Sequence, residues 1–126
     1  MALPGQSFFV VQIPLIGGSL LVDSDPGILE HLMINNVTAA TTLWAQLFDF
    51  PGPPPNGTIP VFNFPLSPLA NLFWTPPKAA AAGQSVIGWK FTSGLTIAVS
   101  STPNVLTVNA AAGIAQVWVW GRGTEL

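Results

Sequence analysis

The chain has 126 residues, of which 49% are hydrophobic and 6% are charged, and its net charge is −2. The absence of cysteine excludes disulfides and thiolate chemistry, and a single histidine excludes a multi-histidine metal site. Three cationic side chains are too few to neutralise a nucleic-acid backbone, and so apolar a composition is the opposite of a disordered chain. We therefore expect one folded domain over residues 1–126, without a metal or other cofactor and without a nucleic-acid partner.

Short runs of β-branched and aromatic residues between turn-forming residues predict an all-β fold. In chain order, the predicted strands cover residues 7–13, 18–23, 28–35, 42–49, 58–64, 70–74, 85–91, 95–100, 104–108 and 114–121. Residues 1–15 are predicted to form an edge strand or an arm that reaches a neighbouring subunit. This pattern fits a single-domain β-sandwich of about 8–10 short antiparallel strands, with a jelly roll as one arrangement and an up-and-down barrel as the alternative.

Turn-forming residues separate the predicted strands. Asp25-Pro26-Gly27 predicts a turn, and the prolines of residues 51–57 predict a loop because they remove backbone donors. Ser93-Gly94 lies between two alternating runs and predicts the tight turn of a hairpin. The alanine-rich residues 79–82 are predicted to form a loop.

The low charge of the chain predicts that partner subunits cover part of its surface. An average domain is about 25% charged, so a free monomer of this composition would be short of solubilising groups. Every long apolar stretch is interrupted by Pro, Gly, Asn or Asp before it reaches the about 20 residues of a spanning helix. The N-terminal residues also lack the features of a signal peptide. We therefore expect a homo-oligomer made in a cytoplasm, with no membrane partner.

Many predicted strands are apolar on both faces, although packing of two sheets buries only the inner face of each strand. The outer faces should therefore also be covered. Aromatic residues are common anchors of such contacts, although Trp118 and Trp120, on one strand face, also suit a sugar-binding platform. We favour subunit packing because the chain is poor in the charged groups that would bind a sugar. The predicted interface residues are Phe8, Phe9, Trp118, Trp120 and Arg122.

The sequence contains no arrangement typical of a catalytic site. His31 is the only imidazole, is expected to point away from the face of Glu30, and has no serine in a G-x-S-x-G turn to accompany it. Asp23 and Asp25 resemble the start of a calcium loop, but the later ligands are missing and an Asx-type turn is predicted. We expect no enzymatic activity. A small hydrolase that uses Glu30 and Asp49, or His31, is the distant alternative.

The order of segments in residues 28–108 resembles a known family. An apolar strand ending in Leu-Met-Ile-Asn-Asn (32–36) precedes Leu-Trp-Ala-Gln-Leu-Phe-Asp (43–49) and Thr-Ile-Pro-Val-Phe-Asn-Phe-Pro-Leu (58–66). The sequence of residues 88–103 then follows the pattern G-x-x-F-x-x-G-L-x-I-A-x-S-x-T-P, which looks like the signature hairpin of the family. This order resembles small bacteriophage virion structural proteins, namely capsid decoration (cement) proteins and head-tail accessory proteins.

The resemblance implies a β-sandwich in a virion, with no catalytic residues. It leads us to expect a capsid decoration protein on the capsid surface, with a trimer as the expected oligomer. Such a protein would stabilise the head shell by binding the major capsid protein across capsid subunits. The alternative is a tail or fibre-associated module of the virion that binds a receptor glycan through exposed tryptophans.

Overall fold

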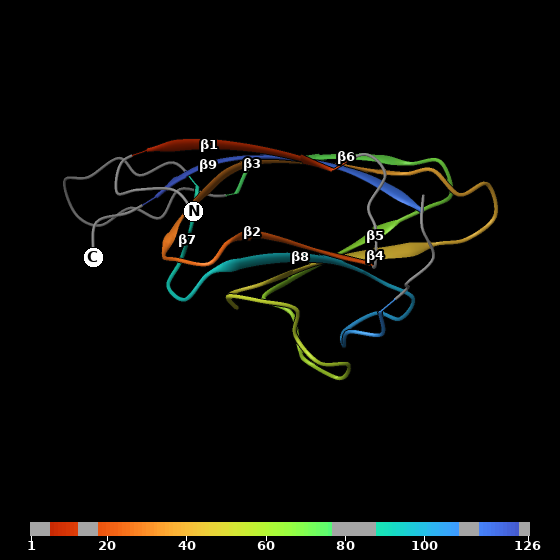
Figure 1. Cartoon of the computed structure of the whole chain (residues 1–126). Helices are drawn as coiled ribbons and strands as arrows, with labels where there is room; N and C mark the ends of the chain where they lie inside the picture. Colours follow the sequence, from red (N-terminus) through yellow and green to blue (C-terminus); the bar gives the residue numbers. More distant parts are fainter. Residues whose placement is uncertain (1–5, 13–17, 77–87, 109–113, 124–126) are drawn as a thin grey trace.

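The computed structural model describes residues 6–12, 18–76, 88–108 and 114–123 (Figure 1). These residues form nine β-strands and no helix, in agreement with the predicted all-β fold. The strands are β1 (Ser7–Gln12), β2 (Ser19–Asp23), β3 (Gly27–Asn36), β4 (Leu43–Phe48), β5 (Phe62–Leu66), β6 (Asn71–Trp74), β7 (Trp89–Phe91), β8 (Leu95–Ser100) and β9 (Ala115–Gly123).

The strand order is that of a jelly roll. The first half of the chain pairs with the second half in nested antiparallel fashion: β1 with β9, β2 with β8, β3 with β6 and β4 with β5. The nested pairs form one long two-stranded antiparallel ribbon. Folding of this ribbon into a roll brings β9 beside β3 and β8 beside β4. The results are sheet A, with order β1-β9-β3-β6 and β7 also paired to β3, and sheet B, with order β2-β8-β4-β5. Figure 1 shows the two sheets as layers, which confirms the sandwich and selects the jelly roll over the barrel.

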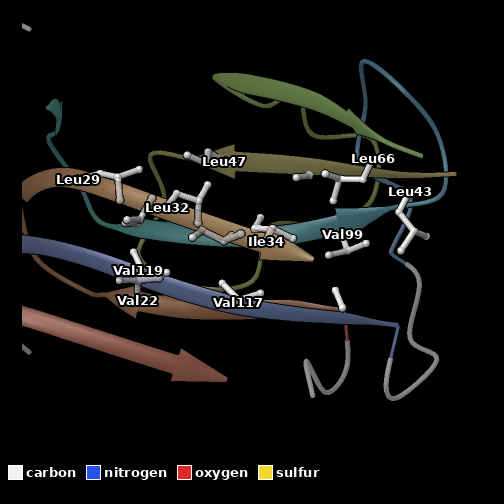
Figure 2. Packing of buried hydrophobic residues seen from close by; sticks show 14 of the residues in the cluster. Val22, Leu29, Leu32, Ile34, Leu43, Leu47, Leu66, Val99, Val117 and Val119 are labelled. Atoms are coloured by element: carbon white, nitrogen blue, oxygen red, sulfur yellow. The ribbon is translucent and has the colours of Figure 1, made fainter. Parts of the chain in front are cut away.

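The main core lies between the two sheets. Alternate residues of each strand point inward, so β3 and β9 of sheet A contribute one set of aliphatic side chains and β4 and β8 of sheet B the facing set (Figure 2). Removal of this apolar surface from water is the main force that holds the sheets together. The fully buried members include Leu29, Leu32, Ile34, Leu43, Leu47, Ile97, Val99, Val117 and Val119.

The outer face of sheet B is covered by the chain itself. The loops of residues 49–61 and 101–108 lie on the side of sheet B that faces away from sheet A (Figure 1). Phe48 and Ala98 point away from the main core and toward these loops. They are buried because they pack with Leu106 of the second loop in a smaller core. The chain itself thus covers part of the outer face of sheet B, although Leu21 of β2 is 45% exposed.

Polar side chains tie the same loops to sheet B. The buried Thr96 hydroxyl lies 2.9 Å from the carbonyl oxygens of both Phe50 and Gly52. The buried Gln46 amide donates to the carbonyl oxygen of Val105 at 3.2 Å. Because an unpaired buried polar group is unfavourable, these contacts favour the observed position of both loops over the sheet.

Several predicted elements differ from the structure. Residues 104–108 form a loop rather than a strand, with one isolated bridge between Ser100 and Val108. The strand predicted at 58–64 begins at Phe62, and of the strand predicted at 85–91 the structure places Trp89–Phe91 in a strand. Residues 79–82 lie outside the described residues.

The prediction of a hairpin at Ser93-Gly94 is wrong, because β7 lies in sheet A and β8 in sheet B. The turn instead carries the chain from one sheet to the other. Asp49, just after β4, holds this turn: its carboxylate accepts hydrogen bonds from the backbone N–H of Thr92 at 2.9 Å and of Ser93 at 2.7 Å. A Cβ on Gly94 would lie 2.7 Å from the Cα of Pro51, so the crossing also requires glycine.

The Asp49 carboxylate makes this turn sensitive to pH. Partial burial raises the pKa of Asp49, but hydrogen bonds from Thr92, Ser93 and Gly94 outweigh that effect and hold the pKa below its ordinary value. A lowered folded-state pKa contributes stability above the unfolded-state pKa, and this contribution is lost as the pH falls through the folded-state pKa.

We expect Asp49→Asn to lower the free energy of unfolding by about 1 kcal/mol at pH 7, a modest value because the carboxylate is partly exposed. The difference from the wild type should shrink below about pH 4, as measured by urea unfolding across pH. Asp25→Asn is the matched control, because its backbone N–H, rather than its carboxylate, makes the local hydrogen bond. A difference that stays constant down to pH 2 would contradict this account.

Candidate interaction surface

The outward side chains of sheet A are large and apolar over the middle of the sheet. Strand alternation turns Val117 and Val119 inward, so Trp118 and Trp120 face outward. Across the sheet, β1 places Phe9 opposite Trp120. We call this surface the aromatic face; it consists of Phe9, Val11, His31, Met33, Phe73, Trp118 and Trp120.

Ring contacts join four of these side chains into a band that crosses the sheet. Phe9 stacks on Trp120, with ring centroids 4.9 Å apart. His31 meets Trp120 edge-on at 6.3 Å and lies 6.0 Å from Phe73. The band therefore runs from edge strand β1 over β9 and β3 to β6. Its ends remain open to solvent, since Phe9 is 55% and Phe73 is 63% exposed.

A β-bulge in β3 brings His31 to this face. Leu29 pairs with Gly121 and His31 with Trp120, so Glu30 is an extra residue in β3. Leu29 and Leu32 both lie in the core, which strict alternation would forbid. The bulge therefore leaves both Glu30 and His31 on the outward side, and the expectation that they point to opposite faces is wrong.

Polar residues border the aromatic face at both ends of the strands. At one end, Ser7 of β1 pairs with Arg122 of β9. At the other end, the Asn35 amide donates to Gln116 Oε1 at 3.3 Å, and Asn71 pairs with Asn35. An apolar centre surrounded by polar groups is the usual anatomy of a protein–protein interface.

The structure brings together most of the predicted interface residues but not all of them. Phe9, Trp118 and Trp120 lie on the aromatic face, and Arg122 lies at its border. Phe8 points to the inner side and packs against the main core, so it does not contribute to this surface. Val11, Met33 and Phe73 were not among the predicted interface residues, because their place on this face depends on strand pairing, which the sequence does not show.

Other aromatic residues have a structural role at the opposite edge of the sandwich. Phe62 of β5 lies 4.8 Å from Trp74 of β6 and 5.2 Å from Trp89 of β7, measured between ring centroids. These rings pack against the main core from both sheets. Trp74 and Trp89 therefore close the sandwich between β5 and β6.

The described part of the chain contains no group of three or more His, Asp or Glu side chains placed to hold a metal ion. The backbone N–H of Asp25 donates to Asp23 Oδ1 at 3.0 Å, which confirms the predicted Asx-type turn. Asp49 is engaged by the turn at residues 92–94. His31 Nδ1 lies 3.2 Å from the hydroxyl of Thr75. No helix among the described residues is long and apolar enough to cross a membrane.

Comparisons with protein-family models, with curated proteins and with solved structures give no match for this chain. The resemblance of residues 28–108 to phage virion proteins therefore stays a prediction, and the functional proposal depends on the fold and on the aromatic face.

Proposed function

We propose that this protein is a non-enzymatic structural protein of a phage virion that decorates the capsid by binding the major capsid protein through the aromatic face. The observation that carries the proposal is the difference between the two outer faces of the sandwich. On sheet B the chain's own loops bury Phe48 and Ala98, although Leu21 and the loop residues Ile59 and Val61 stay exposed. On sheet A, ring contacts join exposed aromatic side chains, including Phe9 and Phe73, into one band.

The chemistry of the aromatic face favours a protein partner. Tryptophan side chains dominate the binding energy of many protein interfaces, particularly when the partner excludes water from them. Sites for small molecules are concave, whereas this surface extends across the strands of a sheet. A standard interface buries about 800 Å² on each partner, an area for which a four-strand sheet face has room.

The position on a capsid is supported by analogy and by the sequence. Jelly rolls occur in viral capsid proteins, although also in lectins and cupins, so the fold alone does not define the function. The segment order of residues 28–108 adds the resemblance to phage virion proteins. A decoration protein that buries apolar surface across joints of the shell would oppose rupture, because separation of the capsid subunits would also break those contacts.

Glycan binding by Trp118 and Trp120 is the alternative use of this surface. A sugar site combines aromatic stacking with several hydrogen-bonding groups. In the centre of the aromatic face, the hydrogen-bonding groups are the two indole N–H groups and the His31 ring, whose Nδ1 already lies within hydrogen-bond distance of Thr75. Further polar groups, such as Asn35 and Gln116, lie at the border and bond to each other. We therefore favour the protein partner.

We expect the double substitution Trp118→Ala and Trp120→Ala to weaken binding to undecorated shells of the same virus at least about tenfold, because each tryptophan would be an interface anchor. Co-sedimentation with the shells measures this. Leu21→Ala is the control, since Leu21 is 45% exposed on sheet B, away from the aromatic face. Thermal unfolding of each variant shows whether the fold is intact.

Equal binding of the wild type and the double variant would overturn the proposed surface. If the wild type ignores shells but binds glycans, and the double variant loses that binding, the glycan-binding alternative replaces the capsid proposal.

A further inference from the structure

Among the described strands, three of the four outer edges of the sandwich carry features that disfavour further strand pairing, and the β1 edge carries none. Exposed edges pair readily with other chains unless they are short, charged, bulged or interrupted by proline. Strand β2 has an irregularity between Leu21 and Asp23, and β5 contains Pro65. The far edge of sheet A is shared by two short strands, β6 of four residues and β7 of three residues, and β7 includes the exposed Lys90. Strand β1, in contrast, is the run Ser-Phe-Phe-Val-Val-Gln, with regular pairing to β9 along its whole length.

The hydrogen bonding of β1 shows which backbone groups its edge presents. Gly123 N–H donates to the carbonyl oxygen of Gln6 at 2.9 Å. In antiparallel pairs, hydrogen-bonded and non-hydrogen-bonded residues alternate. Because the register continues regularly from this pair, the even-numbered residues of β1 bond to β9. The N–H and C=O groups of Ser7, Phe9 and Val11 therefore point away from β9, toward an edge that no described strand occupies.

We propose that this edge pairs with the same edge of a second copy of the chain. The two β1 strands would lie antiparallel about a twofold axis centred on Phe9, with Phe9 opposite Phe9 and Ser7 opposite Val11 of the partner subunit. This register uses every outward N–H and C=O of the described edge, in about six hydrogen bonds.

The second copy fits this edge for reasons of symmetry and charge. In this register, odd-numbered residues of one copy lie opposite odd-numbered residues of the other. Directly opposed residues share a face of the sheet, so the outer faces of sheet A in the two copies lie on the same side of the joined sheet. The two aromatic faces then join through Phe9 and Val11 into one continuous surface. Since β1 carries no charged residue, self-pairing opposes no like charges. The twofold pairing forms a dimer, not the trimer expected from the sequence.

The first test distinguishes the contribution of the backbone N–H groups of β1 to dimerisation from the contribution of its side chains. The double variant Ser7→Pro and Val11→Pro removes outward N–H groups but none of the bonds to β9, and proline is tolerated on edge strands. Ser7→Ala with Val11→Ala is the matched control, which keeps both N–H groups. In sedimentation equilibrium of the full chain, we expect the wild type and the alanine control to be dimers. The proline variant should raise the dimer dissociation constant at least about a hundredfold.

The second test uses the absence of cysteine from the chain. Opposed residues of a hydrogen-bonded pair have Cα atoms about 5.5 Å apart, a separation that a disulfide spans. Phe9→Cys should therefore form a covalent dimer on mild oxidation. The control Leu21→Cys, at a position of the other sheet that is 45% exposed against 55% for Phe9, should stay a monomer on a denaturing gel.

A wild-type chain that is monomeric at about 100 μM, or equal dimerisation of the proline and alanine variants, would overturn the proposal. Failure of Phe9→Cys to cross-link in a chain that does dimerise would overturn the register. The inference does not depend on the capsid proposal, because neither experiment contains capsid.

Discussion

Replacement of Asn36 by alanine is expected to lower the free energy of unfolding by about 3–4 kcal/mol. The Asn36 side chain is buried at the end of β3. Its amide nitrogen lies 2.8 Å from the carbonyl oxygen of Thr41 and 3.0 Å from that of Leu66, and its Oδ1 accepts from the Thr38 N–H at 2.9 Å. One side chain thus joins β3, the loop that follows it and the end of β5. Alanine would leave the buried carbonyl oxygen of Leu66 without this donor, and it would also remove the partly buried hydrogen bonds to Thr38 and Thr41.

Urea unfolding measures this loss, and the neighbouring Asn35 provides the control. Asn35 lies on the outer face and makes one side-chain hydrogen bond, of 3.3 Å. Asn35→Ala should therefore cost about 1 kcal/mol or less. Similar losses for the two variants would show that Asn36 does not have the central role described above.

The substitution Gly121→Ala is expected to destabilise the fold by about 3 kcal/mol. A Cβ at this position would lie 2.3 Å from the carbonyl oxygen of Ile28 and 2.4 Å from Cζ of Phe8. The Phe8 ring can move, but the Ile28 carbonyl belongs to the backbone of β3 beside the bulge and cannot move independently. The variant must therefore distort the centre of sheet A.

Gly52→Ala is the control for this prediction, because no atom lies within 4 Å of a Cβ at Gly52. We expect its unfolding free energy to stay within about 0.5 kcal/mol of the wild type. If Gly121→Ala also lies within that range in urea unfolding, the close approach of β3 to Gly121 does not restrict this position.

The sequence predicted local features of the fold well, because strand positions depend on residues that are near one another in the chain. Alternation placed Trp118 and Trp120 on one face without any knowledge of the partner strands. The same alternation predicts that Phe8 and Phe9 point to opposite faces of the sheet. Which of the two points inward is shown only by the pairing of β1 with β9 and by the contact of Phe8 with the core. The bulge at Glu30 likewise depends on the register with β9, and no local pattern predicted it.

Predictions from the sequence were wrong or incomplete where the local structure depends on contacts with segments far away in the chain. Ser93-Gly94 has the residues of a hairpin turn, but the Asp49 carboxylate and the close approach of Pro51 make it a crossing between sheets. Apolar outer faces predicted partner subunits for the whole molecule. On sheet B, loops from elsewhere in the same chain bury Phe48 and Ala98, a cover within one chain that the sequence pattern did not indicate. The expectation of partner subunits stays a prediction.

The cover over sheet B separates two properties that most binding proteins combine. Substitutions in the small core of Phe48, Ala98 and Leu106 should affect the folding of the chain on its own. Under the proposed function, substitutions on the opposite face of the molecule should instead affect its association with partners. Mutants of this protein should therefore fall into two groups, one that accumulates poorly and one that accumulates normally but fails to associate. The phenotype of a mutant would then indicate whether the substituted residue lies under the loops of sheet B or on the outer face of sheet A. A genetic screen could therefore assign residues to these two layers without a structure.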